Sequence, residues 1–277
     1  MLIDLHLHTN YSDGTLKPHE VVKKAALNNI GIISICDHNT VTAYPELIKS
    51  CADHEIKLIT GVEVDCFMGS KYIHVLGYGF ELNDSKLLAL LDDCAKKIEY
   101  QNDAVIFNMA KDYSIDLDEY KKYVSPPEIG GYKNSNFLLQ KGIIKSIPEY
   151  HLLRKKYGVN LNEIGLPDLN FVCETIKFAG GFPVLAHPWQ KLDNINFTND
   201  LQTAVDAGIM GFECYYPGHT IKMTKTCVDF CNENNLIITG GSDDHGEFLK
   251  EVDGIVYQMG KMKLDVNRIK AWSKHLN

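Results

Sequence analysis

The sequence of 277 residues predicts an α/β fold with a parallel, barrel-like sheet. Short apolar runs of strand length alternate with amphipathic helical patterns along much of the chain. Strand, helix and strand in this rhythm predict parallel pairing through right-handed crossovers. Seven runs are strand candidates: LIDLHLH, IGIISIC, IKLITGVEV, YIHVLGYG, GFPVLAHP, AGIMGFECYY and NLIITGGSDD.

Helical patterns connect several of these runs. The first is TLKPHEVVKKAALNNIG, where Thr15 is suited to cap a helix, Pro18 to begin it and Gly31 to end it. ETIKFAGG precedes the fifth run and TNDLQTAVDAGI precedes the sixth, and both have similar spacing. These connections are what parallel strands require.

Residues 84–168 interrupt the rhythm. They contain the long, charged pattern SKLLALLDDCAKKIEYQNDAVIFNMAKDY, followed by NSNFLLQKGI and SIPEYHLLRKKYG, and all three read as helices. We therefore expect a helical insertion subdomain at 84–168, with the barrel formed by residues 1–83 and 169–277.

Composition limits the possible partners and location. The net charge is −8, and only Arg154 and Arg268 are arginines among 28 basic residues, which argues against binding of long nucleic acid. The eight cysteines form no CxxC pair, so we expect free, buried thiols. A strand at residues 2–8 leaves no room for a signal peptide, and no apolar run is long enough to span a membrane. We expect a cytoplasmic protein with no membrane partner; the sequence does not identify protein partners.

Polar side chains recur where the predicted strands end, and functional groups gather at those ends in parallel α/β barrels. His6 and His8 are two positions apart, so both side chains point to one face of their strand. The set at or near strand ends is His6, His8, Asp13, Asp37, His38, Glu63, His74, His187, Asp243, Asp244 and His245.

Each of these residues has a structural alternative. A single histidine at a strand end is more often a hydrogen-bonded structural group than a ligand, and Asp37 is suited to cap the next turn. However, six of the eleven histidines fall at or near strand ends, each within an apolar run. This distribution predicts a metal cluster. Imidazoles and carboxylates without cysteine favour Zn, Mn or Fe, and nine ligands suit three ions that share one carboxylate.

The motifs together identify a family. DLHLHTNYSDG, CDHNT, TGVEV, HVLGYG, LAHP and GSDDH resemble, in order, the motifs of the PHP (polymerase and histidinol phosphatase) domain family. The resemblance implies a distorted (β/α)7 TIM-like barrel. It also implies three groups of metal ligands: His6, His8, Glu63 and Asp243; Glu63, His74 and His187; and Asp13, His38 and His245.

The insertion before LAHP resembles the branch of stand-alone phosphoesterases that act on nucleoside 3',5'-bisphosphates and on short 5'-phosphorylated oligonucleotides. That branch implies an arginine motif early in the insertion, but this chain has Gly-Gly-Tyr-Lys-Asn at residues 130–134. Lys133 or Arg154 is the candidate replacement for phosphate binding. His219, in the loop after the sixth run, is a candidate to contact phosphate or to protonate the leaving oxygen.

The predicted function is phosphoester hydrolysis of small phosphorylated substrates by a metal-activated hydroxide. The predicted catalytic residues are Asp13, His38, Glu63 and His219, and Asp37 and Asp244 are candidates to orient ligand histidines. Three alternatives remain: another phosphomonoester such as histidinol phosphate, an amide substrate, or a metal-binding module without turnover.

Overall fold

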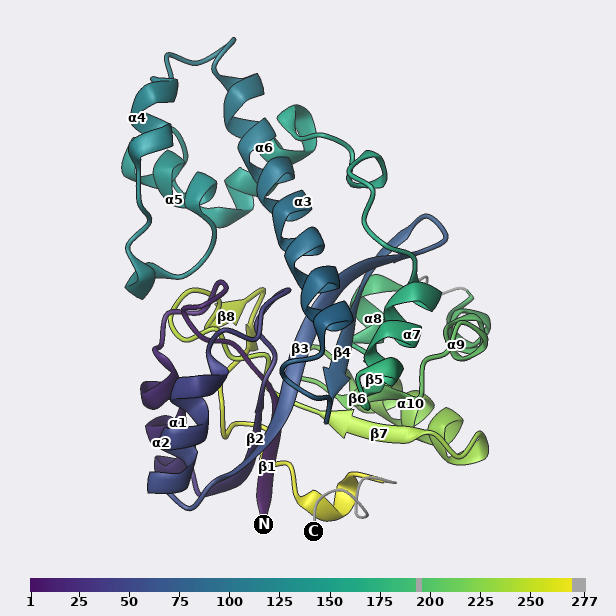
Figure 1. The fold of residues 1–277 in the computed structure, drawn as a ribbon. Helices are drawn as coiled ribbons and strands as arrows, with labels where there is room; N and C mark the ends of the chain where they lie inside the picture. Colours follow the sequence, from purple (N-terminus) through teal and green to yellow (C-terminus); the bar gives the residue numbers. More distant parts are fainter. Residues whose placement is uncertain (193–195, 271–277) are drawn as a thin grey trace.

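The computed structural model describes residues 1–192 and 196–270, and within them seven strands form one sheet in sequence order (Figure 1). Each predicted run overlaps one strand: β1 (Leu2–Leu7), β2 (Ile30–Ile35), β3 (Lys57–Met68), β4 (Lys71–Tyr78), β5 (Phe182–Leu185), β6 (Gly211–Tyr215) and β7 (Ile237–Gly240). Neighbouring strands pair in parallel except at β4, which is antiparallel to β3 and β5. The α/β class and the mostly parallel seven-stranded sheet are confirmed.

The direction of β4 corrects the expectation of parallel pairing throughout. Gly69 and Ser70 connect β3 to β4, and Gly69 has φ +61°, as tight hairpins require. Because β4 runs backwards, its first half lies at the C-terminal end of the parallel strands, where His74 pairs with Asp65. Glu63 also lies within β3, not at its end, because that strand continues past it.

Backbone hydrogen bonds join the two ends of the sheet near the candidate site. Asp243 N donates to His6 O (2.8 Å), and His8 N donates to Asp244 O (3.0 Å). The segment after β7 therefore lies beside the end of β1. The strand order alone does not establish a closed (β/α)7 barrel, which stays a prediction.

Helices cover the sheet on its outer side (Figure 1). They are α1 (Pro18–Leu27), α2 (Tyr44–Asp53), α7 (Leu169–Phe178), α8 (Pro188–Lys191), α9 (Phe197–Asp206) and α10 (Ile221–Glu233). Lys17, not Thr15, is the N-cap of α1. Thr15 Oγ1 instead accepts a hydrogen bond from Glu247 N (3.1 Å). A short hairpin of β8 (Glu251–Val252) and β9 (Ile255–Val256) follows β7.

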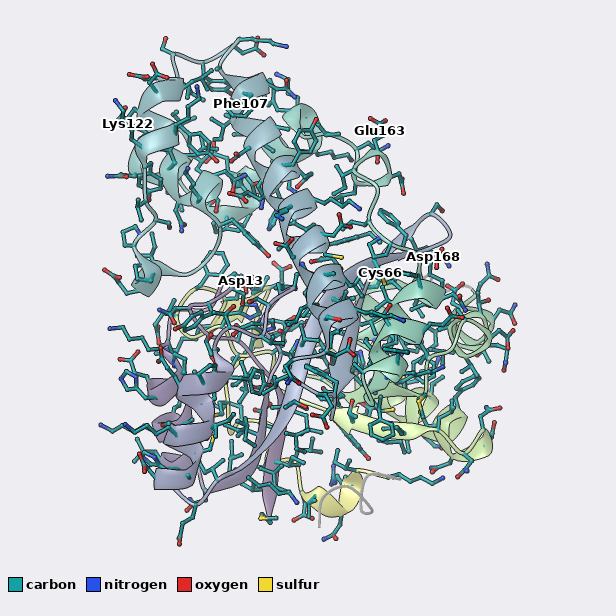
Figure 2. The ribbon with its side chains drawn as sticks, viewed as in Figure 1. Asp13, Cys66, Phe107, Lys122, Glu163 and Asp168 are labelled. Atoms are coloured by element: carbon teal, nitrogen blue, oxygen red, sulfur yellow. The ribbon has the colours of Figure 1, made fainter. Side chains whose placement is uncertain are left out.

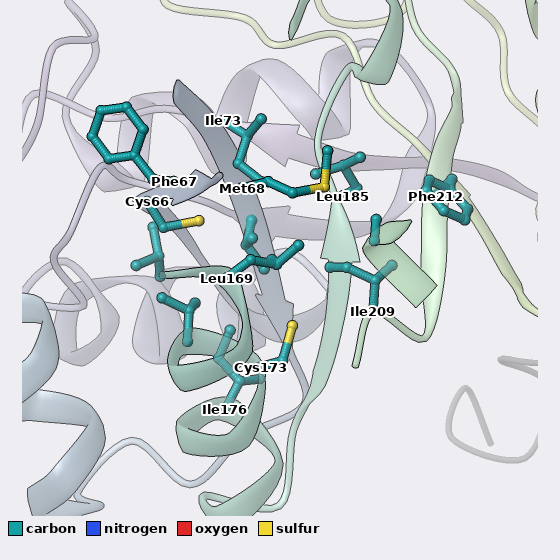
Figure 3. Close-up of a cluster of buried hydrophobic side chains, with 14 of the residues drawn as sticks. Cys66, Phe67, Met68, Ile73, Leu169, Cys173, Ile176, Leu185, Ile209 and Phe212 are labelled. Atoms are coloured by element: carbon teal, nitrogen blue, oxygen red, sulfur yellow. The ribbon is translucent and has the colours of Figure 1, made fainter. Parts of the chain in front are cut away.

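The main buried core lies between the helices and the sheet. Figure 3 shows Leu169, Cys173 and Ile176 of α7 facing Cys66 and Leu185 of the sheet. Burial of these side chains from water is the main stabilising contribution. All eight cysteines are free and buried, as predicted. No helix in the described ranges combines the length and the apolar character needed to cross a bilayer.

Residues between β4 and α7 form a group of helices that lies above one end of the sheet (Figure 1). Their helices are α3 (Ser85–Met109), α4 (Leu117–Lys122), α5 (Lys133–Gln140) and α6 (Ile147–Tyr157). They have a buried cluster of their own, which includes Tyr120, Phe137 and Tyr150. The boundaries 84–168 stay a prediction.

Candidate metal centre

Glu63 is at the centre of a polar cluster at one end of the sheet, and its side chain is 1% exposed. Its Oε2 lies 3.2 Å from His6 Nε2 and 3.3 Å from His8 Nε2. Its Oε1 lies 2.8 Å from His74 Nδ1 and 3.0 Å from His187 Nε2. Imidazoles from β1, β4 and the segment after β5 therefore converge on one carboxylate.

Three overlapping groups of side chains place their nitrogen and oxygen atoms within 4.8 Å of one another. The groups are His6, His8, Glu63 and Asp243; His38, Glu63 and His74; and His8, Asp13, His38 and His245. His187 joins the second group through Glu63. The structure thus brings all nine predicted ligand residues together. The groups resemble those implied by the motifs, except that His8 and His38 each belong to two.

Local backbone geometry explains how the strands place these side chains. His6 lies on β1 and His8, two positions further on, follows its last residue, so both side chains point the same way, and their ring centroids are 5.2 Å apart. His187 and Asp243 follow strands β5 and β7 with φ values of 25° and 54°. Positive φ is uncommon outside glycine and concentrates at functional sites. The chain therefore bends sharply where these two side chains enter the cluster.

Charges within the cluster shift the pKa values of its members. Burial alone would raise the pKa of Glu63, but the surrounding histidines outweigh it and hold that pKa well below its usual range. Burial alone would lower the pKa of His245, but Asp13 and Asp243 raise it to about 9. Burial lowers the pKa of His74 to about 4. The site therefore holds ionised carboxylates among imidazoles of very different proton affinity.

Several buried ring nitrogens have no hydrogen-bond partner among the described residues. Among the candidate ligands they are both nitrogens of His8 and the Nδ1 atoms of His38 and His187, and His219 Nε2 is a further one outside the cluster. Buried polar atoms nearly always have a partner, so these nitrogens are suited to a bound ion. The donors are nitrogen and oxygen without thiolate, which suits Zn, Mn or Fe. The residues therefore fit the divalent ions expected here.

Glu213 is a functional candidate that the sequence analysis missed. It lies on β6 with 0% exposure. Its Oε1 lies 2.9 Å from His6 Nδ1, and its Oε2 accepts a hydrogen bond from His187 N (2.8 Å). Such contacts fix the orientation of metal-binding histidines. A carboxylate inside the apolar run GFECYY was the available signal.

Asp37 and Asp244, which were expected to orient ligand histidines, have other hydrogen-bond partners among the described residues. Asp37 accepts hydrogen bonds from Thr9 N (2.7 Å) and Ser12 Oγ (2.7 Å), so it fixes the loop after β1. The Asp244 carboxylate accepts hydrogen bonds from Lys24 Nζ (2.5 Å) and from the backbone N–H groups of Gly246 and Met259. Both carboxylates are therefore held by backbone and side-chain donors other than the ligand histidines.

Asp65, which the sequence analysis also missed, lies beside the second ligand group. Its Oδ1 lies 3.3 Å from His74 Nε2, and it also accepts hydrogen bonds from Asn39 and Tyr72. It shares a face of β3 with Glu63 because the two residues are two positions apart. The imidazole of His74 is therefore held between two carboxylates.

A cavity of about 210 Å³ adjoins the cluster at His38. It lies between the loops after β1 and β2 and the insertion, and Figure 2 shows Asp13 in the part of the molecule below the insertion, which carries Phe107 and Lys122. Side chains from both parts line it, among them Tyr11, Asn39, Glu99, Asn102, Asp103, Tyr132 and Lys133. Lys133 Nζ lies over the ring of Tyr120 (4.7 Å), not in contact with the cluster.

The other two predicted substrate residues also lie outside the cluster. Arg154 donates through Nε and Nη2 to Gln101 Oε1 (3.1 and 2.8 Å) and lines a separate hollow beside Tyr72. His219 Nδ1 lies 3.1 Å from Cys214 O. Its ring packs against Tyr216, whose hydroxyl donates to Asp243 Oδ2 (2.9 Å). His219 thus lies one side chain away from a candidate ligand.

Comparisons with known proteins agree with this geometry. A family model described as PHP domain matches residues 4–157. A phosphoribosyl 1,2-cyclic phosphate 1,2-diphosphodiesterase from Eggerthella lenta is 27% identical over 90% of this chain and 95% of its own length. A 5'-3' exoribonuclease from Haemophilus influenzae is 25% identical over 91% and 96%. A 3',5'-nucleoside bisphosphate phosphatase from Chromobacterium violaceum is 25% identical over 88% and 87%.

Solved structures support the fold. One described as a metal-dependent phosphoesterase from Bifidobacterium adolescentis has a TM-score of 0.77 and 19% identity, covering 96% of this chain and 97% of its own. An amidohydrolase from Chromobacterium violaceum has a TM-score of 0.75 and 22% identity, covering 93% and 90%. At these identities the likeness concerns the arrangement of strands and helices.

Proposed function

Because this chain belongs to the PHP domain family and is a metal-dependent phosphoesterase, we propose that it hydrolyses phosphate esters of nucleotides. The proposed substrates are nucleoside 3',5'-bisphosphates or short 5'-phosphorylated oligonucleotides. The relatives named as a 3',5'-nucleoside bisphosphate phosphatase and a 5'-3' exoribonuclease, which align over most of the chain, support this proposal. The observation that carries the proposal is the nine-residue cluster with a small cavity directly beside it.

We assign three divalent ions to the three overlapping groups of ligands. Glu63 is the proposed shared carboxylate, since both of its oxygens face imidazoles of different groups. Asp13 is the proposed carboxylate ligand of the third group, together with His38 and His245. Bound divalent cations lower the pKa of a coordinated water and stabilise negative charge on phosphoryl oxygens. Closure of the sheet as a distorted barrel, supported by the bonds between β1 and the segment after β7, is the proposed frame.

The cavity at His38 is the proposed site for the nucleoside part of the substrate. Its amide and phenol groups, including those of Asn102 and Tyr132, are suited to hydrogen bonds with a base or ribose. Glu99 and Asp103 also face it, and their negative charge disfavours a phosphate there. The reacting phosphate therefore belongs at the ligand cluster and the uncharged part in the cavity.

The residues around the cluster have distinct proposed roles. Hydrolysis adds water to phosphorus, breaks the ester P–O bond and returns a proton to the leaving oxygen. Burial lowers the pKa of His219, so its ring is neutral near pH 7 and is suited to accept a hydrogen bond. This favours substrate positioning by His219 over protonation of the leaving group. Tyr216 positions Asp243 through its hydroxyl.

A second candidate substrate is a cyclic phosphodiester of a sugar. The Eggerthella lenta relative carries this activity in its name and aligns over 90% of this chain. The same cluster is suited to either ester, because both reactions place water opposite a departing sugar oxygen. The nature of the sugar and base in the cavity distinguishes the two candidates.

A substrate panel tests the proposal. The purified chain, loaded in turn with Mn, Zn or Fe, is supplied with adenosine 3',5'-bisphosphate, a 5'-phosphorylated RNA trinucleotide, a ribose 1,2-cyclic phosphate and histidinol phosphate. We expect the fastest product release from one of the first two, and inhibition by inorganic phosphate. Fast release from histidinol phosphate with none from nucleotides would overturn the substrate. Turnover of amides that phosphate does not inhibit would overturn the assigned chemistry.

A further inference from the structure

Lys191 is a cation at the edge of the candidate metal centre to which neither the motifs nor the comparisons give a role. It ends α8, four residues after His187, and its side chain is partly buried. Its Nζ lies 3.4 Å from His74 Nε2 and 5.0 Å from the centroid of the Tyr72 ring. The ammonium group therefore faces the second ligand group directly.

Within residues 1–192 and 196–270, no carboxylate oxygen lies within 4.0 Å of this ammonium group. Several other lysines form ion pairs, for example Lys24 with Asp244 (2.5 Å) and Lys225 with Asp229 (2.5 Å). The nearby carboxylates of Glu63 and Asp65 lie on opposite sides of the His74 ring, and each contacts one of its nitrogens. Lys191 thus enters an acidic site without an ion pair among the described residues.

Cations bound by the cluster would place further positive charge close to Lys191. A partly buried ammonium group beside metal ions is costly unless an anion lies between them. The oxygens of a phosphoryl group are such an anion, since they contact metal ions and accept hydrogen bonds from lysine together. Of the phosphates that the proposed substrates carry, the reacting one is the group that the proposed chemistry brings next to the ligand cluster.

The other candidate cations are less well placed for this role. Lys133 lies over Tyr120 on the insertion side of the cavity, and its Nζ is also 3.5 Å from Lys121 O. Arg154 is tied to Gln101 and lines a hollow that does not include any of the nine candidate ligands. Lys191 is the cation among these three that contacts a candidate ligand.

We propose that Lys191 binds a non-bridging oxygen of the reacting phosphate and thereby supplies the cation that the arginine-free segment 130–134 lacks. This inference rests on the proposed function. It assigns Lys191 to substrate binding, and it predicts that phosphate affinity, not metal content, depends on this side chain.

The test compares Lys191→Met, which removes the charge at similar length, with Lys191→Arg and with the exposed control Lys225→Met. Each metal-loaded protein is assayed for metal content by elemental analysis, for inorganic phosphate binding by calorimetry, and for KM and kcat. We expect Lys191→Met to weaken phosphate binding and raise KM roughly tenfold to a hundredfold, the effect of one charged hydrogen bond, with metal content unchanged. Lys191→Arg should recover most of the phosphate affinity, and Lys225→Met should match the wild type.

Two outcomes would overturn the inference. One is unchanged phosphate affinity and KM in Lys191→Met. The other is loss of metal in both Lys191 variants with normal phosphate affinity per bound metal, which would make the lysine a structural partner of His74. A wild-type protein that is inactive on nucleotides would overturn the proposed function but not this inference. Calorimetry with inorganic phosphate still measures the contribution of Lys191 in that case.

Discussion

Glu213 Oε1 lies 2.9 Å from His6 Nδ1, while the other ring nitrogen of His6 faces Glu63 Oε2 at 3.2 Å. The first contact fixes the tautomer with the proton on Nδ1 and leaves Nε2 free to bind an ion. Glu213 also accepts from His187 N, so one buried carboxylate orients two candidate ligands. Positioning of this kind typically contributes tenfold to a hundredfold in metal affinity.

We therefore expect Glu213→Gln to weaken metal binding by about tenfold to a hundredfold, because the neutral amide no longer favours the Nδ1–H tautomer of His6. Titration of the metal-free variant with Mn or Zn, using a competing chelator, measures this loss. The control is Glu233→Gln, at an exposed position near the end of α10, and this variant should bind metal like the wild type. Equal affinity in all three proteins would show that Glu213 has only a packing role.

The sequence was sufficient to predict the strands and the ligand positions because both are local patterns. Alternation in DLHLH places two imidazoles on one face, and apolar runs mark the strands. The direction of β4 was missed because the predicted runs stop at Val64 and resume at Tyr72, whereas the observed strands continue until only Gly69 and Ser70 separate them, as in a hairpin. That reversal is what brings His74 to the site.

Residues missed by sequence analysis act through contacts between distant segments. Glu213 and His6 are 207 residues apart, and no spacing rule connects them. Lys191 looks like an ordinary lysine near a helix end, and only the fold brings it against His74 on β4. Such pairs depend on the register of strands and on loop paths, which local patterns do not determine.

The third ligand group makes a direct prediction about activity. We expect Asp13→Ala and His245→Ala each to lower kcat/KM on the best nucleotide substrate by about a thousandfold, because losing an ion removes several kcal/mol of transition-state stabilisation. Steady-state kinetics together with metal analysis measures this effect, and circular dichroism checks that the variants fold. Asp92→Ala, at an exposed position on α3, is the matched control. Normal turnover by either site variant would rule out the assigned third ion.

Metal binding should depend on pH through His245. Its pKa in the folded metal-free protein is about 9, against an ordinary value of 6.5, because the nearby carboxylates outweigh the effect of burial. A metal ion needs the neutral imidazole, so we expect affinity to rise by up to about tenfold per pH unit between pH 6.5 and 9. Calorimetry in buffers of different ionisation enthalpy should detect the released proton at pH 7.

The raised pKa of His245 has the opposite effect on the stability of the metal-free protein, which should fall as the pH rises. A folded-state pKa above the unfolded value stabilises the fold below about pH 6.5, and this contribution is lost as pH rises through about 9. Thermal unfolding of metal-free protein should therefore show a falling Tm over this window, which His245→Asn should reduce. A Tm that rises with pH in the wild type would contradict the assigned charge state.

The last prediction concerns the contact between the insertion and the loop that carries Asp13. Gly131 N donates to Asp13 O (2.7 Å), and Gly131 has φ +68°. A Cβ at this position would lie 2.6 Å from the ring of Phe248, so alanine would push the insertion loop away from a candidate ligand. Gly142 is a matched control because it has φ +66° but open space around its Cβ position.

Both alanine variants should lose about 1–2 kcal/mol of stability from the left-handed backbone conformation, and Gly131→Ala should lose more because of the clash with Phe248. Only Gly131→Ala should also lower kcat/KM, by roughly tenfold to a hundredfold, because displacement of the Asp13 loop misplaces the third ligand group. Denaturant unfolding and steady-state kinetics on both variants separate the two effects. If Gly142→Ala lost as much activity as Gly131→Ala at equal stability, the docking of the insertion on the Asp13 loop would have no part in catalysis.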